Sequence, residues 1–253
     1  MSSHTSLPTF RALPEQEIVR GAEFYRNTLQ RVHACLKPDV YLEIGVRHGL
    51  SLALSAARIS IGVDPMPELQ ASLDARFRVV TASSDAFFAG SAGALPDAPI
   101  DLAFIDGMHW FEFALRDFIN VERRASRCGA ILFDDIFPNH PLQAERTRQS
   151  GVWTGDVWKI LPCLRKHRPE LTLLPLDTHP SGLLAVANLD PDNRVLSDNY
   201  ADIVREFTAP GPVLGADTLS RDGAWHPADA RLCELLDALY RRRQPVDGNC
   251  RGA

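Results

Sequence analysis

The stretch YLEIGVRHGLS, from Tyr41 to Ser51, begins with a β-prone run that contains Glu43 and continues into a turn with Gly45 and Gly49. An alanine- and leucine-rich segment follows, so the stretch predicts a strand, a tight turn and the start of a helix. Glycine allows a ligand to approach the backbone closely, and the free N–H groups at a helix start attract a carboxylate or a phosphate. We therefore expect the loop to hold the anionic end of a cofactor, although the same spacing also suits an ordinary strand-to-helix turn.

Short β-rich runs alternate with helical patterns from Val40 onward. The runs are VYLEIGV, SIGVD, FRVVTA, DLAFID and GAILFDD, and helical spacing separates them in segments such as 50–58 and 111–126. Because the runs are apolar almost throughout, helices should cover both faces of the sheet. Two later runs, 171–177 and 182–190, are joined only by THPS, which is too short for a crossover, so they must be antiparallel. We predict an α/β, doubly wound, mostly parallel seven-stranded sheet with an antiparallel last strand.

The composition restricts the partners of the protein. A chain of 253 residues with 45% hydrophobic content can bury a large core, and its net charge of -5 argues against nucleic acid, whose binding proteins usually present a basic stripe. The five cysteines form no CxxC pair, which disfavours a zinc site or a disulfide framework. No charged-then-apolar leader opens the chain, and no apolar run reaches roughly 18 residues. We expect a cytoplasmic protein with no membrane partner.

Acidic residues follow the second and third of these runs. Asp64 comes about 20 residues after the glycines, where a carboxylate can accept hydrogen bonds from ribose hydroxyls. Ser84 and Asp85 follow the third run, where they could meet an adenine amino group. Either acid could instead cap a helix or a turn.

The pattern EIGVRHG at residues 43–49, with Asp64, Asp85 and the closing hairpin, resembles class I S-adenosylmethionine (SAM) dependent methyltransferases over roughly residues 38–190. The resemblance implies a Rossmann-like fold with helices on both faces, a loop that accommodates the methionine part of SAM, and acids that bind ribose and adenine. Dinucleotide dehydrogenases share the glycines and the ribose acid, but they lack the antiparallel hairpin, and the spacing here is GxxxG. The cofactor-binding residues so implied are Glu43, Gly45, Gly49, Ser51, Asp64, Ser84, Asp85 and Asp106.

The fourth and fifth runs end in further acids. FIDGMHWFE contains Asp106 and His109, and LFDDIF contains Asp134 and Asp135. Three carboxylates at the mouth of a parallel sheet would repel one another, and a divalent cation such as Mg²⁺ would relieve that repulsion and could activate a substrate hydroxyl. The same motifs resemble metal-dependent O-methyltransferases that act on macrolide sugars and, more distantly, on catechols. That likeness implies Asp106, Asp134 and Asp135 as metal ligands and His109 as general base, since an ordinary histidine pKa of about 6.5 suits this role. Each residue taken alone could be a cap or a hydrogen-bonded structural group.

Two tryptophans and a second histidine complete the candidates. Trp110 and Trp153 are expected in the substrate pocket, with core packing as the near-equal alternative for Trp153. His140, in PNHP, is a second base candidate or an exposed loop residue. The catalytic candidates are thus Asp106, His109 and His140.

The connection after the fifth run is long and polar, from Pro138 to Gly151, as lids and binding loops often are. Beyond it, Asp156 is a good N-cap for a helix over 157–161. Pro162 should kink or end that helix.

Three regions are predicted. Residues 1–37 form an N-terminal helical extension with an amphipathic helix from Ile18 to Leu36. Residues 38–192 form the SAM-binding catalytic domain. Residues 193–253 form a C-terminal extension that ends in an amphipathic helix, which would pack on its own domain or form a homodimer contact.

The leading hypothesis is a SAM-dependent methyltransferase that transfers a methyl group to a hydroxyl of a small-molecule acceptor, with Mg²⁺ and a histidine base. A metal-independent N- or C-methyltransferase is one alternative. A non-catalytic SAM-binding module is another, although binding alone does not require the acidic cluster. An NAD-dependent oxidoreductase is the third, and it would bind a dinucleotide.

Overall fold

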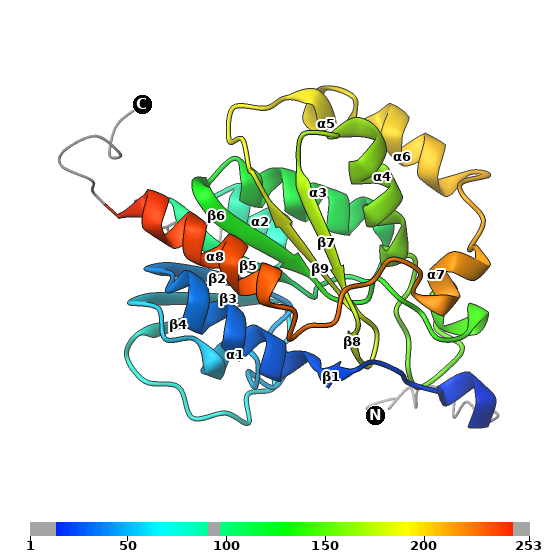
Figure 1. Cartoon of the computed structure of the whole chain (residues 1–253), viewed down its shortest axis with the longest axis horizontal. Helices are drawn as coiled ribbons and strands as arrows, with labels where there is room; N and C mark the ends of the chain where they lie inside the picture. Colours follow the sequence, from blue (N-terminus) through cyan, green and yellow to red (C-terminus); the bar gives the residue numbers. More distant parts are fainter. Residues whose placement is uncertain (1–13, 91–96, 245–253) are drawn as a thin grey trace, which may run out of the picture.

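The computed structural model describes residues 14–90 and 97–244 and contains a seven-stranded sheet (Figure 1). The strands lie in the order β4, β3, β2, β5, β6, β9, β7. All neighbours from β4 to β6 are parallel, and β9 is antiparallel to both β6 and β7, so the predicted doubly wound fold is confirmed. The strand bounds are Val40–Ile44 (β2), Ile59–Asp64 (β3), Phe77–Thr81 (β4), Ile100–Ile105 (β5), Ala125–Phe133 (β6), Thr172–Leu176 (β7) and Leu183–Ala187 (β9).

Side chains of the central strands enter two apolar cores, one on each face of the sheet. Val40 and Leu42 of β2 belong to the core covered by α3, α4 and α6, whereas Tyr41 belongs to the core covered by α1 and α8. Alternate residues of a strand point to opposite faces, and both faces are covered here, so every residue of β2 is buried. Within the described residues, no helix combines the length and the apolar character needed to cross a membrane. The helix bounds are Tyr25–Leu36 (α1), Ser84–Phe88 (α2), Phe111–Glu122 (α3), Ile160–His167 (α4), Val195–Asp198 (α5), Tyr200–Thr208 (α6), Ala216–Ser220 (α7) and Ala230–Arg243 (α8).

The first and last helices pack side by side on one face of the sheet (Figure 1). The leucine stripe of α8 is buried there against α1 and β6 of the same chain. The prediction that the leading helix starts near Ile18 is wrong, because the chain is extended up to Phe24. Gly21 has a φ of +138° and lies against the backbone of Thr178, and β1 (Glu23–Phe24) pairs with β8 (Thr178–His179).

The helix expected after the glycine loop is absent. A single 3₁₀ turn, η2 (Leu52–Leu54), stands in its place. Ser55 ends this turn in extended conformation, and its hydroxyl accepts a hydrogen bond from the N–H of Ala57. Serine side chains compete in this way with helical hydrogen bonds, so the chain turns directly into β3.

The helix around Pro162 also differs from the prediction. The 3₁₀ turn η4 (Val157–Lys159) leads into α4, and Pro162 is the third residue of α4 rather than its end. Proline is tolerated in the first turn because the N–H groups there have no partner within the helix. Asp156 does not cap its own turn; instead its carboxylate accepts a hydrogen bond of 2.7 Å from the N–H of Phe111, at the start of α3.

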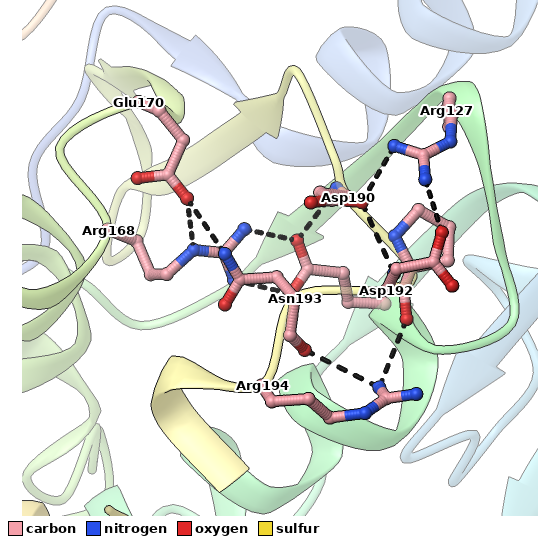
Figure 2. Close-up of polar contacts among 9 residues, drawn as sticks. Arg127, Arg168, Glu170, Asp190, Asp192, Asn193 and Arg194 are labelled. Atoms are coloured by element: carbon pink, nitrogen blue, oxygen red, sulfur yellow. Dashed lines mark hydrogen bonds and ion pairs between the residues drawn. The ribbon is translucent and has the colours of Figure 1, made fainter. Parts of the chain in front are cut away.

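A charged network lies at the end of the sheet where β6 begins, away from the strand ends that carry the predicted site (Figure 2). Arg168 is 1% exposed and donates two hydrogen bonds, of 2.7 and 2.9 Å, to Glu122 of α3. Arg127 of β6 pairs with Asp190 and Asp192, which follow β9. The Arg127 pairs attach the segment after β9 to β6, and the Arg168 pair attaches the residue after α4 to α3.

Candidate functional site

A cavity of about 670 Å³ opens at the carboxyl ends of β2, β3, β4, β5 and β6. Small-molecule sites commonly measure about 300–1,000 Å³, and in doubly wound sheets they lie at this edge. The residues predicted for the site that line it are Gly45, Ser51, Asp64, Ser84, Asp85, Asp106, His109, Asp134, Asp135 and Trp153. The predicted residues outside its lining are Glu43, Gly49, Trp110 and His140.

The glycine loop passes close to the end of β5. Gly45 has a φ of +88°, and a Cβ atom at this position would lie 1.8 Å from the carbonyl oxygen of Asp106. Only glycine fits such an approach in this backbone conformation. Asp64 holds the loop from β3, because one of its oxygens accepts hydrogen bonds from the N–H groups of Val46 (2.9 Å) and Arg47 (2.8 Å).

Glu43 lies beneath this loop rather than in the cavity. Its carboxyl group is fully buried and accepts hydrogen bonds of 2.6 Å from the hydroxyls of Tyr41 and Ser51. Burial raises the pKa of Glu43 to about 8. The side chain therefore fixes Ser51, which does line the cavity, and acts on the site through it.

The acid predicted to meet adenine is engaged by an arginine. Asp85 pairs with Arg116 through both oxygens, at 2.6 and 2.7 Å. It is not the N-cap of α2, because Ser83 accepts the capping hydrogen bond from the N–H of Ala86. Asp85 and Ser84 line the cavity next to each other.

Asp117 of α3 is a cavity residue that the sequence analysis missed. It is 3% exposed and hydrogen-bonded by Ser84, and burial raises its pKa to about 7. The signal was an acid on the apolar face of a predicted helix, next to Phe118. Tyr25, predicted only as part of an apolar helix stripe, also reaches the cavity from α1.

Asp106, His109 and Asp135 converge at the ends of β5 and β6. One ligand atom from each lies within 4.8 Å of the others. His109 Nδ1 is 3.0 Å from Asp135 Oδ2, and His109 Nε2 is 3.5 Å from Asp106 Oδ1. Asp134 is adjacent, but its Oδ1 accepts the N–H of Asp135 at 2.9 Å, so the convergent set contains His109 where Asp134 was predicted.

The electrostatics of this cluster suit a divalent cation. Burial and the charges of Asp135 and Asp106 raise the pKa of Asp134 well above its ordinary range, and burial raises that of Asp135 to about 6. If all of the buried acids were ionised, they would therefore carry more negative charge than the single positive ring of His109 compensates. Carboxylate oxygens are the ligands that Mg²⁺ and Mn²⁺ prefer, and an added imidazole also fits transition metals, so the residues present fit a cation.

The ring of His109 is held in one orientation by Trp153. Its Nδ1 lies 2.8 Å from the carbonyl oxygen of Trp153, and the two rings stack at 5.0 Å between centroids. A carbonyl can only accept, so Nδ1 carries a proton, and the neutral ring has its free lone pair on Nε2. Burial disfavours the charged ring, but the charges of Asp135 and Asp106 outweigh it and raise the pKa of His109 to about 10. In the absence of another cation, His109 is the positive partner of the acids.

The remaining two candidates lie away from this cluster. Trp110 precedes α3, and its indole N–H donates to the carbonyl oxygen of Arg146 at 2.9 Å. His140 precedes the 3₁₀ turn η3 (Pro141–Ala144), and its Nδ1 accepts the N–H of Leu142 at 3.1 Å. Both side chains make hydrogen bonds that organise the connection after β6.

The comparisons with known proteins agree with this geometry. Residues 42–136, which extend from β2 to the acids after β6, match a family model described as a methyltransferase domain. Among solved structures, the chain is similar to cofactor-bound Rv0187 from MTB (19% identity, 70% of this chain and 85% of that chain covered, TM-score 0.51). It is also similar to the SAH-bound methyltransferase PaMTH1 of Podospora anserina (16% identity, 66% and 78% covered, TM-score 0.51). At these identities the structural likeness shows a shared fold. The search of curated proteins found no match.

Proposed function

We propose that the chain is a class I SAM-dependent methyltransferase that transfers the methyl group to a hydroxyl of a small-molecule acceptor, with the help of a divalent cation such as Mg²⁺. The observation that carries the proposal is the convergence of Asp106, His109 and Asp135, with buried Asp134 beside them, in the same cavity as Asp64. Bound SAM supplies an electrophilic methyl group, and a bound cation supplies a Lewis acid that lowers the pKa of the acceptor hydroxyl.

The order of the strand ends supports the assignment of SAM to this cavity. Ser84 and Asp85 follow β4 and are proposed for adenine, and Asp64 at the end of β3 is proposed for ribose. Gly45 and Ser51 follow β2 and are proposed for the methionine part. The acidic cluster follows β5 and β6, so a methyl group carried beyond the ribose would face it.

The acids and His109 have separate roles in the proposal. Asp106 and Asp135 would hold the cation, with Asp134 beside them as a third acid that could contribute its other oxygen. His109 would then no longer be needed as the positive partner of these acids, since a cation reverses the local effect on pKa. Its Nδ1 stays on the carbonyl of Trp153, and its Nε2 accepts the proton of the acceptor hydroxyl.

The test is methyl transfer from radiolabelled SAM to a panel of small hydroxyl compounds, with Mg²⁺ or with EDTA. We expect product with Mg²⁺, loss of product with EDTA, and a fall of roughly 100-fold or more in His109→Gln, as for a lost general base. The exposed Arg58→Gln serves as a matched surface control. Titration of Mn²⁺ into the wild type and Asp135→Asn reports the cation site without turnover. Turnover that EDTA does not affect would remove the cation from the mechanism.

A metal-independent methyltransferase is the second candidate, and one observation favours it. The His109 ring already supplies a positive charge 3.0 Å from Asp135. A cluster neutralised in this way needs no further cation, and its acceptor could be a nitrogen or a carbon atom as well. Activity in EDTA together with no Mn²⁺ binding would select this candidate.

A further inference from the structure

The loop after β2 carries a cation for which the sequence analysis assigned no role. Arg47 lines the cavity and is exposed, and within residues 14–90 and 97–244 its guanidinium has no carboxylate partner. Its backbone is held from two sides: its N–H donates to Asp64 at 2.8 Å, and its carbonyl accepts the N–H of Glu68 at 2.8 Å. Its φ is +44°, a conformation uncommon for residues other than glycine, so this backbone is constrained by its contacts.

The charges around the cavity make Arg47 distinctive. Among the described residues that line it, Arg47 is the only arginine or lysine. A carboxylate that enters such an acidic cavity is repelled unless a cation meets it, and the ring of His109 is already engaged by Asp106 and Asp135. The aspartates in the lining are Asp64, Asp85, Asp106, Asp117, Asp134 and Asp135.

SAM has one carboxylate, at its amino-acid end. The helix start that the sequence predicted as the binding site for this anion is not formed. We expected the N–H groups of a helix after Gly49 to bind an anion, but η2 contains only three residues. A charged side chain of the loop can take over that role. His48 is a poor candidate, because its ring is already bonded to the carbonyl of Glu68 at 3.1 Å.

We propose that Arg47 binds the carboxylate of the amino-acid end of SAM and of S-adenosylhomocysteine (SAH). The inference rests on the proposed function, since it concerns the same cavity. Arg47 belongs to the loop that contacts both ends of the proposed ligand: its N–H bonds to Asp64, assigned to ribose, and Gly45 of the same loop packs against Asp106, assigned to the reacting end. The amino-acid end of SAM branches from the sulfur, which joins the ribose to the reacting methyl group, so with the proposed assignments it would lie near this loop. A guanidinium can donate two parallel hydrogen bonds to a carboxylate, which makes this one of the stronger polar contacts in proteins.

The experiment is calorimetric titration of the full chain with SAH and with 5′-deoxy-5′-methylthioadenosine. The second ligand has the same adenosine and thioether but no carboxylate. We expect Arg47→Gln to weaken SAH binding about 10- to 100-fold, the loss typical of a charged hydrogen bond, and to leave methylthioadenosine binding within about twofold. Arg47→Lys keeps the charge and should recover part of the affinity. Arg58→Gln, an exposed arginine on the same segment outside the cavity lining, should change neither ligand.

The outcomes separate this proposal from the proposed function. Equal losses for both ligands in Arg47→Gln would mean that Arg47 acts by shaping the loop, which overturns the proposal. Arg47→Gly relieves the positive φ, so wild-type SAH affinity in this variant overturns it as well. A wild-type protein that binds neither ligand refutes the proposed function, and the role of Arg47 with it. Melting temperatures of all variants show whether each is folded.

Discussion

Glu43 should make the stability of the protein fall as pH rises. Burial raises its pKa from an ordinary value of 4.5 to about 8, even though Ser51 and Tyr41 donate hydrogen bonds to it. The unfolded chain releases this proton near the ordinary pKa, whereas the folded chain keeps it up to about pH 8. The folded state therefore binds more protons in that window, and the free energy of unfolding decreases with pH. One proton corresponds to about 1.4 kcal/mol per pH unit, or about 3 kcal/mol between about pH 5.5 and about pH 8.

The assay compares urea unfolding of the wild type and Glu43→Gln at several pH values in this window. Glutamine resembles the protonated acid and does not titrate. The free energy of unfolding of the variant, relative to the wild type, should therefore rise by about 3 kcal/mol from the acidic to the alkaline end of the window. Other titrating groups are common to both proteins and cancel in the difference. The control variant Glu234→Gln changes an exposed acid of α8, and its difference in stability from the wild type should not depend on pH. A Glu43→Gln difference that does not depend on pH would refute the reasoning.

Three other changes give defined outcomes. Burial lowers the pKa of His33 to about 4, below its ordinary value of 6.5. The unfolded chain therefore binds a proton below about pH 6.5 that the folded chain does not bind, and stability is lost as pH falls below that value. Thermal melts at about pH 4 and about pH 7 should show that His33→Leu loses about 3 kcal/mol less stability than the wild type between the two pH values. Arg168→Met leaves Glu122 buried without its partner and should cost about 3–5 kcal/mol in urea unfolding, whereas adding Glu122→Met should restore most of the loss. Gly45→Ala forces a Cβ against Asp106 at a φ of +88° and should weaken SAH binding roughly tenfold or more in calorimetry, while unchanged affinity would show that the loop can move away.

The sheet could be predicted because its signals are local. Apolar runs such as the one around Leu42 are continuous, which is typical of strands covered on both faces, and every residue of β2 and β5 is indeed buried. The four-residue connection THPS permits only an antiparallel pair. Because parallel strands end at one edge, the sequence alone places the acids Asp64, Asp106 and Asp135 at one edge of the sheet, and all three line the cavity.

The helix ends and the hydrogen-bond partners are harder to predict from the sequence, because contacts with distant residues decide them. The leading helix starts late because Gly21 packs on Thr178, which is far away in the sequence. Asp156 has the sequence position of a cap for its own turn, yet it accepts the N–H of Phe111. Nothing in the local pattern distinguishes Arg47 from any exposed arginine. Its place in an acidic cavity becomes visible only when the strand ends are brought together.

The most direct test of SAM binding in this cavity is a calorimetric titration of the full chain with SAH, with NAD as the comparison. We predict that SAH binds at one site per chain and that NAD does not bind. Binding of NAD in place of SAH would contradict the assignment of this cavity to SAM, as would the absence of any heat with SAH.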